Sequence, residues 1–136
     1  MMVARTFTRR CAGLLTLAYS MALPALVQAK ALVPEVSRGQ QLVESRCFAC
    51  HSLDANRAGP ALRGVVGRKA GKAEGFVYSE AMAAAIHTWT VSSLKAWLTN
   101  PEKVVPGQAM NYYLEQAQDR EDVVTYLTSL SKPAQK

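Results

Sequence analysis

Residues 47–51 read Cys47-Phe48-Ala49-Cys50-His51, which is the pattern C-x-x-C-H. On a helical turn, two thiols three residues apart point to the same side. They can form thioether bonds to the two vinyl groups of one porphyrin, while the adjacent His51 turns its imidazole toward the iron. The pattern therefore predicts one covalently attached c-type haem, bound through Cys47 and Cys50 and ligated by His51.

Two other interpretations of these residues stay open at this point. A redox-active dithiol of the thioredoxin kind needs a βαβ setting, and the sequence shows no such pattern. A zinc site needs a fourth ligand, and His87 is the only other His or Cys after residue 29.

The first 29 residues have the three-part pattern of an export signal. Residues 1–10 are basic, residues 11–27 are mostly apolar, and residues 27–29 (Val-Gln-Ala) suit a signal peptidase. We expect cleavage after Ala29 and a mature protein, residues 30–136, in the periplasm. A retained membrane anchor is the alternative, although a run of 17 residues that includes Gly13, Thr16, Ser20 and Pro24 is marginal for spanning about 30 Å of hydrocarbon.

Removing the signal changes the charge balance. The full sequence has 16 basic and ten acidic residues, a net charge of +6. Three arginines lie in the first ten residues, so residues 30–136 keep 13 basic and ten acidic side chains. Because no basic stripe interleaved with aromatic residues remains, we expect no nucleic-acid partner.

The 107 residues of the mature chain predict one small all-α domain. No stretch shows sustained period-two alternation. We expect helices over residues 37–47, from Ser79 through 83–85, over 91–100 and from Asp119 onward. Ser37 and Ser79 are the expected N-caps of the first two helices, and Pro101 ends the third. Residues 56–77 hold five glycines and predict an irregular loop.

The expected helices have apolar faces that define a core. These faces hold Gly39 and Val43 in the first helix, Leu94, Trp97 and Leu98 in the third, and Val123, Tyr126, Leu127 and Leu130 in the last. Short helices and a long glycine-rich loop make a thin core for a chain of this size. We therefore expect the haem itself to fill the interior.

A haem iron ligated by His51 needs a second ligand on its other face, commonly Met and sometimes His. Met110 follows Pro106 and Gly107 in a loop, where its side chain is free of helical constraint. Met82 lies among alanines in an expected helix, where a methionine more often fills a core. His87 would give ligation by two histidines. Met110 is the strongest of the three candidates.

Several ordered motifs resemble the small class I cytochromes c, the soluble monohaem kind of mitochondria and bacteria. They are CFACH at 47–51, GPALRGVVGRKAG at 59–71, the spacing of Tyr78 and Trp89, NPEKVVPGQAM at 100–110 and REDVVTYL at 120–127. The resemblance covers Val36 to Leu130. It implies a fold in which the N- and C-terminal helices cross near the haem.

The resemblance also implies roles for individual residues. Met110 matches the family's axial methionine, which stands after a P-G-x-x motif. Pro60 matches a proline whose carbonyl accepts a hydrogen bond from the haem histidine, with a simple loop turn as the alternative. Arg68, Tyr78 and Trp89 match positions that hydrogen-bond a haem propionate, and core packing is the alternative for Trp89.

Two positions near the expected haem depart from the family pattern. Trp97 stands where many relatives have a tyrosine that hydrogen-bonds the axial sulfur, so whether its indole N–H reaches Met110 stays open. Met82 replaces an asparagine and so removes a polar group from the haem surroundings.

The expected docking surface departs from the pattern as well. Relatives of the mitochondrial type carry a ring of lysines around the haem edge. Here Glu102 and Ala109 stand at two of those positions, which leaves Arg46 and Lys103. We expect docking that depends less on salt and more on apolar contact, through Tyr112 beside the haem edge.

Together these features predict a monomeric periplasmic electron carrier that acts between a redox-protein donor and acceptor. It would contact a membrane only transiently, or permanently if the signal is retained. A coordinatively saturated iron offers no site for substrate chemistry, so we expect no enzyme activity. The alternative is a haem enzyme or gas sensor, in which Met110 would dissociate readily.

Overall fold

The computed structural model describes residues 35–131, so the expected export signal at 1–29 lies outside the described residues. In chain order the helices of this range are α1 (Val36–Arg46), α2 (Glu80–Ala83), α3 (Val91–Thr99), α4 (Pro101–Val104) and α5 (Ala117–Ser129). The only β pairing among the described residues is an isolated bridge between Lys69 and Thr88. The predicted all-α class is confirmed. None of these helices is long and apolar enough to cross a membrane.

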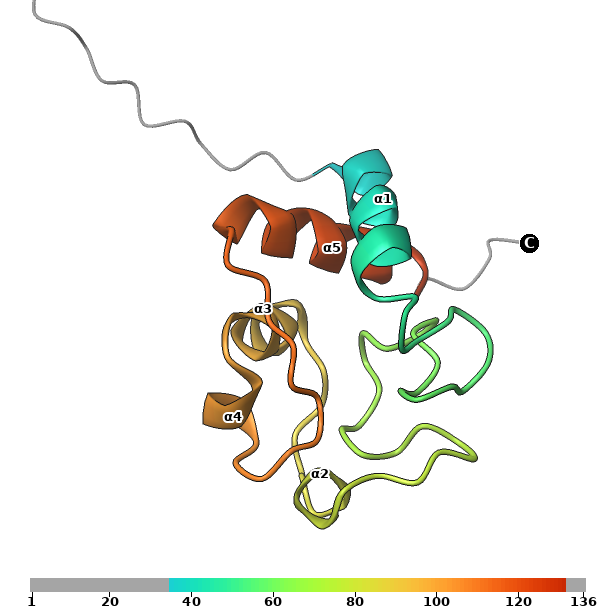
Figure 1. The fold of residues 1–136 in the computed structure, drawn as a ribbon, viewed down its shortest axis with the longest axis vertical. Coiled ribbons are helices and arrows are strands. Elements are labelled where there is room, and N and C mark those ends of the chain that lie inside the picture. Colours follow the sequence, from blue (N-terminus) through green and yellow to red (C-terminus); the bar gives the residue numbers. More distant parts are fainter. Residues whose placement is uncertain (1–34, 132–136) are drawn as a thin grey trace, which may run out of the picture.

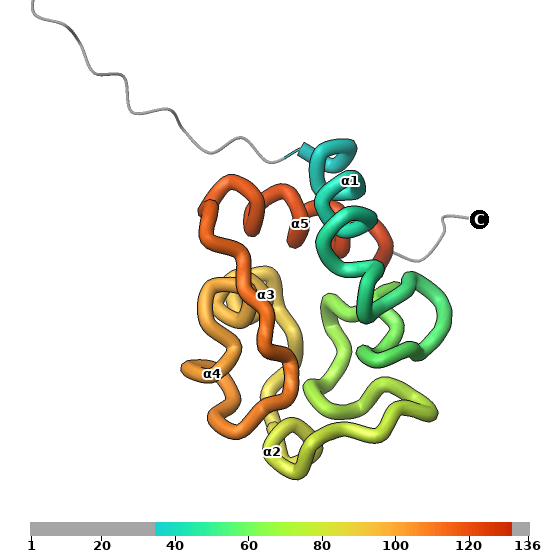
Figure 2. The backbone as a smooth tube through the Cα atoms, in the orientation of Figure 1, coloured from blue at the N-terminus to red at the C-terminus, as the bar shows by residue number. Residues whose placement is uncertain are grey.

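The helices and the long loop occupy different parts of the molecule (Figure 1). α1 crosses α5 at one end, α3 and α4 follow below α5, and α2 lies at the opposite end. Residues 47–79 wind without a helix along the other side, as the backbone tube shows in green (Figure 2). The predicted irregular loop over 56–77 is therefore confirmed.

The crossing of α1 and α5 rests on a very close approach of the two backbones. A Cβ atom at Gly39 would lie 2.0 Å from the backbone oxygen of Asp122, so only glycine permits this distance. Next to it, Val43 and Val123 are 0% and 1% exposed and share one core cluster with Tyr126. The predicted helix faces are confirmed. Their packing positions the end of α1, where Cys47 follows as the C-cap.

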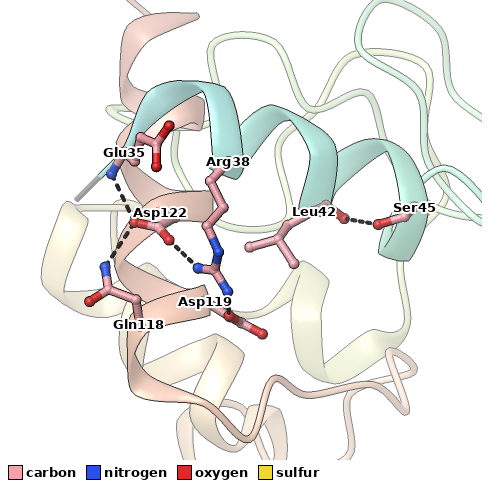
Figure 3. Close-up of polar contacts among 7 residues, drawn as sticks. All are labelled: Glu35, Arg38, Leu42, Ser45, Gln118, Asp119 and Asp122. Carbon is pink, nitrogen blue, oxygen red and sulfur yellow. Dashed lines mark hydrogen bonds and ion pairs between the residues drawn. The ribbon is translucent and has the colours of Figure 1, made fainter. Parts of the chain in front are cut away.

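The start of α1 differs from the prediction. The helix begins at Val36, and Ser37 is not its N-cap, because its hydroxyl instead donates to the Glu35 carboxylate. The Glu35 N–H donates to Asp122 Oδ1 at 2.8 Å, so a carboxylate from α5 stabilises this end of α1. Asp122 is 1% exposed and also accepts hydrogen bonds from Arg38 and Gln118 (Figure 3).

The start of α5 also differs from the prediction. The helix begins at Ala117, two residues before Asp119. The Asp119 carboxylate accepts a hydrogen bond from the Arg38 guanidinium, which also contacts Asp122 (Figure 3). Asp119, at which the helix was expected to start, therefore forms an ion pair with the neighbouring helix, as Asp122 does.

The shorter helices have local caps. The Ser79 hydroxyl accepts from the Met82 N–H at 3.4 Å, so the predicted cap of α2 is confirmed. α3 ends at Thr99 with Asn100 as its C-cap, in agreement with the predicted end before Pro101. The Asn100 side chain then accepts from the Lys103 N–H at 3.1 Å and begins α4, a turn that the sequence analysis did not expect. α3 buries Leu94, Trp97 and Leu98 toward the interior.

Candidate cofactor site

A cavity of about 710 Å³ lies between the long loop and the helices. This volume is within the range of about 300–1,000 Å³ that is usual for cofactor sites. All eight residues that the sequence analysis singled out line it: Cys47, Cys50, His51, Pro60, Arg68, Tyr78, Trp89 and Met110. Much of the remaining wall is apolar and comes from Leu62, Val65, Leu94, Leu98, Val123 and Leu127.

His51 is oriented by the loop that follows it. Its Nδ1 lies 2.7 Å from the backbone oxygen of Pro60. A carbonyl oxygen can only accept, so Nδ1 carries the proton and Nε2 keeps the lone pair that a metal needs. A Cβ atom at Gly59 would lie 2.3 Å from His51 Cε1, so glycine makes room for the imidazole. Both neighbours hold the ring in one orientation.

The two cysteines lie on the turn that ends α1. The N–H groups of Cys50 and His51 both donate to the Cys47 carbonyl, at 3.1 and 2.9 Å, so the pentapeptide closes into one turn. Neither cysteine is in a disulfide, and Cys50 is exposed whereas Cys47 is partly buried. Burial raises the pKa of the Cys47 thiol to about 11. A dithiol oxidoreductase depends on a thiolate with a lowered pKa, so this environment does not suit one.

His87 lies away from these residues. It does not line the cavity, and its ring packs edge-on against Trp89 with ring centroids 4.6 Å apart. Among residues 35–131, no group of three or more His, Cys, Asp or Glu side chains could hold a metal ion. A zinc site that combines His87 with Cys47, Cys50 and His51 therefore does not fit this geometry.

Arg68 places a cation on the cavity wall. One of its N–H groups donates to the Ala61 carbonyl at 2.8 Å, and no carboxylate of the described residues pairs with it. Burial lowers the pKa of the guanidinium, although an arginine stays charged at neutral pH. A partly buried cation without a counter-charge is costly, so this wall suits an anionic group.

Two further polar groups lie on the same cavity. The Tyr78 hydroxyl accepts from the Ala73 N–H at 3.3 Å, which leaves its own proton available for donation. Trp89, which carries an indole N–H donor, is 7% exposed and lines the same cavity. With Arg68 they form a donor set on an otherwise apolar cavity, which fits a flat apolar cofactor that carries carboxylates.

Two methionines line the cavity, Met110 and Met82. Met110 belongs to a segment without helix between α4 and α5, whereas Met82 is 7% exposed within α2. Trp97 also lines the cavity and packs edge-on against Trp89 with ring centroids 5.2 Å apart. Trp97 and Met110 thus line the same cavity.

A model of the cytochrome c family matches residues 36–131. The chain belongs to the cytochrome c family. It is 36% identical over 102 residues to cytochrome c of Gibberella zeae, with 72% of this chain and 96% of that protein covered. It is 42% identical over 102 residues to cytochrome c of Tetrahymena pyriformis, with 72% and 93% covered.

Bacterial proteins are similar as well. Cytochrome c-type cyt cy of Rhodobacter capsulatus is 38% identical over 100 residues, which cover 72% of this chain and 50% of that protein. The structure of cytochrome cH from Methylobacterium extorquens superposes with a TM-score of 0.66 at 36% identity, and covers 70% of this chain and 98% of that one. The predicted family and fold are confirmed: the protein is an electron-transfer cytochrome of a family that binds haem c covalently and works with redox partners.

One residue that shapes the site was not predicted from the sequence. Gly59 was expected only as part of a loop, although the absence of its side chain makes room for His51. The G-P pair eight residues after His51 was the available signal. Met82, by contrast, was expected both as a core residue and near the haem, and it lines the cavity.

Proposed function

We propose that this cytochrome is a periplasmic single-electron carrier with one haem c, bound through Cys47 and Cys50 and ligated by His51 and Met110. When bound, this group supplies the one-electron oxidation and reduction of its iron. The main support is the convergence of these four side chains on one cavity of about 710 Å³.

His51 acts through its Nε2 lone pair. The 2.7 Å contact of Nδ1 with the Pro60 oxygen fixes the tautomer and raises the basicity of the ring. Gly59 lets the ring lie this close to the loop, because a Cβ atom there would overlap the imidazole. Pro60 is thus more than a loop turn in this proposal, since its carbonyl orients the ligand.

Arg68, Tyr78 and Trp89 serve the carboxylates of the cofactor. A carboxylate that is removed from water needs donors or a counter-charge. Arg68 supplies the charge, and the Tyr78 hydroxyl and Trp89 indole N–H supply neutral donors on the same cavity wall. The apolar side chains around them exclude water and lower the local dielectric constant.

Met110 completes the ligand set. A thioether opposite an imidazole favours a higher reduction potential than two harder ligands do. With His51 and Met110 both holding the iron, no ligand position would be left for a substrate, so we propose that the protein is a carrier and not an enzyme. The loop position of Met110 supports it over Met82, whose side chain starts from the helical α2.

The location and partners complete the proposal. We propose that residues 1–29 direct export and are removed, on the basis of their basic start and apolar run. The mature protein is then a periplasmic monomer that exchanges electrons with one redox protein as donor and another as acceptor.

The ligand set is tested with three variants of the purified holoprotein: Met110→Ala, Met82→Ala and His87→Ala. We expect only Met110→Ala to change the ligand-field spectrum of the ferric protein, to lower the reduction potential and to admit carbon monoxide rapidly. A spectral change confined to His87→Ala or Met82→Ala would contradict the proposed ligand. Rapid binding of carbon monoxide by the unmodified protein would favour the gas sensor or haem enzyme instead.

A further inference from the structure

Met110 lies on a loop whose two ends are fixed in the core. Val105 and Leu114 are 6% and 5% exposed, and the Leu114 N–H donates to the Leu98 carbonyl at 2.8 Å. The segment between these ends, residues 106–113, runs without a helix from α4 toward α5 (Figure 1). We call it the methionine loop. Its position decides whether Met110 lines the cofactor cavity.

The backbone hydrogen bonds of the methionine loop are local. The Gln108 N–H donates to the Val105 carbonyl at 3.1 Å, and the Tyr112 N–H donates to the Met110 carbonyl at 2.9 Å. Neither bond reaches a helix. Among residues 35–131, the hydrogen bonds that join the methionine loop to a helix all end on one side chain, that of Glu102 in α4.

The Glu102 carboxylate uses both oxygens for this contact. Oε1 accepts from the Gly107 N–H at 2.8 Å, and Oε2 accepts from the Gln108 side-chain amide at 3.4 Å. The first bond is charge-assisted and short, which makes it the stronger of the two. The Gln108 Oε1 atom is buried without a hydrogen-bond partner among the described residues, so the contact with Glu102 is what pairs this amide.

The helix that carries Glu102 is itself held in place. The Asn100 side chain accepts from the Lys103 N–H at 3.1 Å, and the Val105 N–H donates to the Pro101 carbonyl at 2.9 Å. Pro101 is buried, and α4 packs against α3. Glu102 therefore joins a loop with few other bonds to a fixed part of the molecule. Such loops open locally at low free-energy cost, so one contact of this kind has a large share in keeping them closed.

We propose that Glu102 is a positioning residue that keeps the methionine loop closed and so holds Met110 at the cavity. Opening of the loop carries Gly107 and Gln108 away from the carboxylate, so both hydrogen bonds are lost in the open state. The inference rests on the proposed ligand role of Met110 and adds a residue that controls how long this ligand stays in place. The sequence indicated Glu102 only as a missing lysine of the docking surface.

The test measures how fast imidazole displaces Met110 in the ferric holoprotein, by stopped-flow absorbance at about pH 8. Most imidazole is uncharged at this pH, so a change of charge at residue 102 has little direct effect on the probe. At saturating imidazole the rate is limited by opening of the methionine loop. Met110→Ala should bind imidazole without this limit, which tests the ligand assignment separately.

Glu102→Ala should raise the limiting rate about fivefold, the effect of one net hydrogen bond. Glu102→Gln keeps an oxygen that can accept from the Gly107 N–H, so it should raise the rate only about twofold. Glu74→Ala is the matched control and should leave the rate unchanged. Glu74 is exposed, and its carboxylate has no ion-pair partner among residues 35–131 and does not line the cavity.

Hydrogen exchange of the ferrous holoprotein gives a second measurement. In Glu102→Ala the Gly107 amide should exchange about fivefold faster, whereas the amides of α1 and α5 should keep their wild-type rates. A general loss of stability would speed all of them. Equal limiting rates in wild type and Glu102→Ala, or equal increases in Glu102→Ala and Glu74→Ala, would overturn the inference. The rapid binding of imidazole by Met110→Ala would still stand in that case.

Discussion

The α1–α5 crossing and the loop of residues 47–79 are stabilised in opposite ways. At the crossing, protein touches protein: Val43 and Val123 are 0% and 1% exposed, and a Cβ at Gly39 would lie 2.0 Å from the Asp122 carbonyl oxygen. Residues 47–79 form no helix and supply much of the wall of a cavity of about 710 Å³. The helical pair is thus fixed by its own side chains, whereas the loop depends on what fills the cavity.

The largest effect should come from removing the cofactor attachment. In the double variant Cys47→Ala, Cys50→Ala, we expect the loop to lose its support, because an empty apolar cavity of this size is costly. Hydrogen exchange should show unprotected amides over 52–79, with residual protection confined to α1 and α5. Cooperative thermal unfolding with wild-type protection in the loop would mean that the loop is stable on its own.

The next effect tests the crossing with the cofactor in place. Gly39→Ala forces a Cβ against the backbone of α5, and overpacking of this kind costs about 3 kcal/mol. Ser37→Ala is the matched control in the same helix and should change stability by less than about 0.5 kcal/mol, because this hydroxyl caps nothing. Urea unfolding of both holoproteins measures the difference, and equal stabilities would show that the crossing is looser than described.

Asp122→Asn probes the buried carboxylate at the crossing. Burial raises the pKa of Asp122, but hydrogen bonds from the Glu35 N–H, Arg38 and Gln118 outweigh this and hold the pKa below its usual value. Losing this charge in Asp122→Asn should lower the free energy of unfolding by about 2 kcal/mol near neutral pH. Urea unfolding at pH 7 measures the loss.

The same variant predicts a pH dependence. The folded pKa of Asp122 is below the unfolded value of about 4, so its stabilisation is present above that pH and lost as pH falls through the folded pKa. The stability difference between wild type and Asp122→Asn should therefore shrink below about pH 4. A constant difference down to the lowest accessible pH would contradict the lowered pKa.

The smallest effect is expected at the outer edge of the crossing. The Asp119 side chain is 18% exposed, and it shares Arg38 with the far more buried Asp122. Asp119→Asn should cost less than about 1 kcal/mol, as for most ion pairs near the surface. If Asp119→Asn lowered the free energy of unfolding as much as Asp122→Asn does, the stabilisation would come from the pairing with Arg38 and not from the burial of Asp122.

The two regions also differ in how far the sequence predicted them. Apolar spacing predicted which faces of α1, α3 and α5 are buried, because that information lies within each helix. The starts of α1 and α5 were predicted wrongly. Ser37 and Asp119 have the right chemistry for local caps, but Asp122 and Arg38 bind across the crossing, and local patterns contain no information on contacts between distant segments.

For the site, covalent attachment through the pentapeptide stays a prediction, whereas the motifs correctly predicted which residues lie together. All eight candidates line one cavity, although they are spread over residues 47–110. A second hollow of about 370 Å³ beside this cavity was not predicted as a space, since it forms only when α1 and the segment before α5 are brought together. Tyr112 alone was expected beside the cofactor.

The most direct test of the account is the covalent state of Cys47 and Cys50 in the purified holoprotein. After protease digestion, mass spectrometry should find the peptide that contains residues 47–51 heavier by one haem, and acidified acetone should extract no haem. If haem passes into the solvent and both thiols react freely with an alkylating reagent, the cysteines do not attach the cofactor and the account fails.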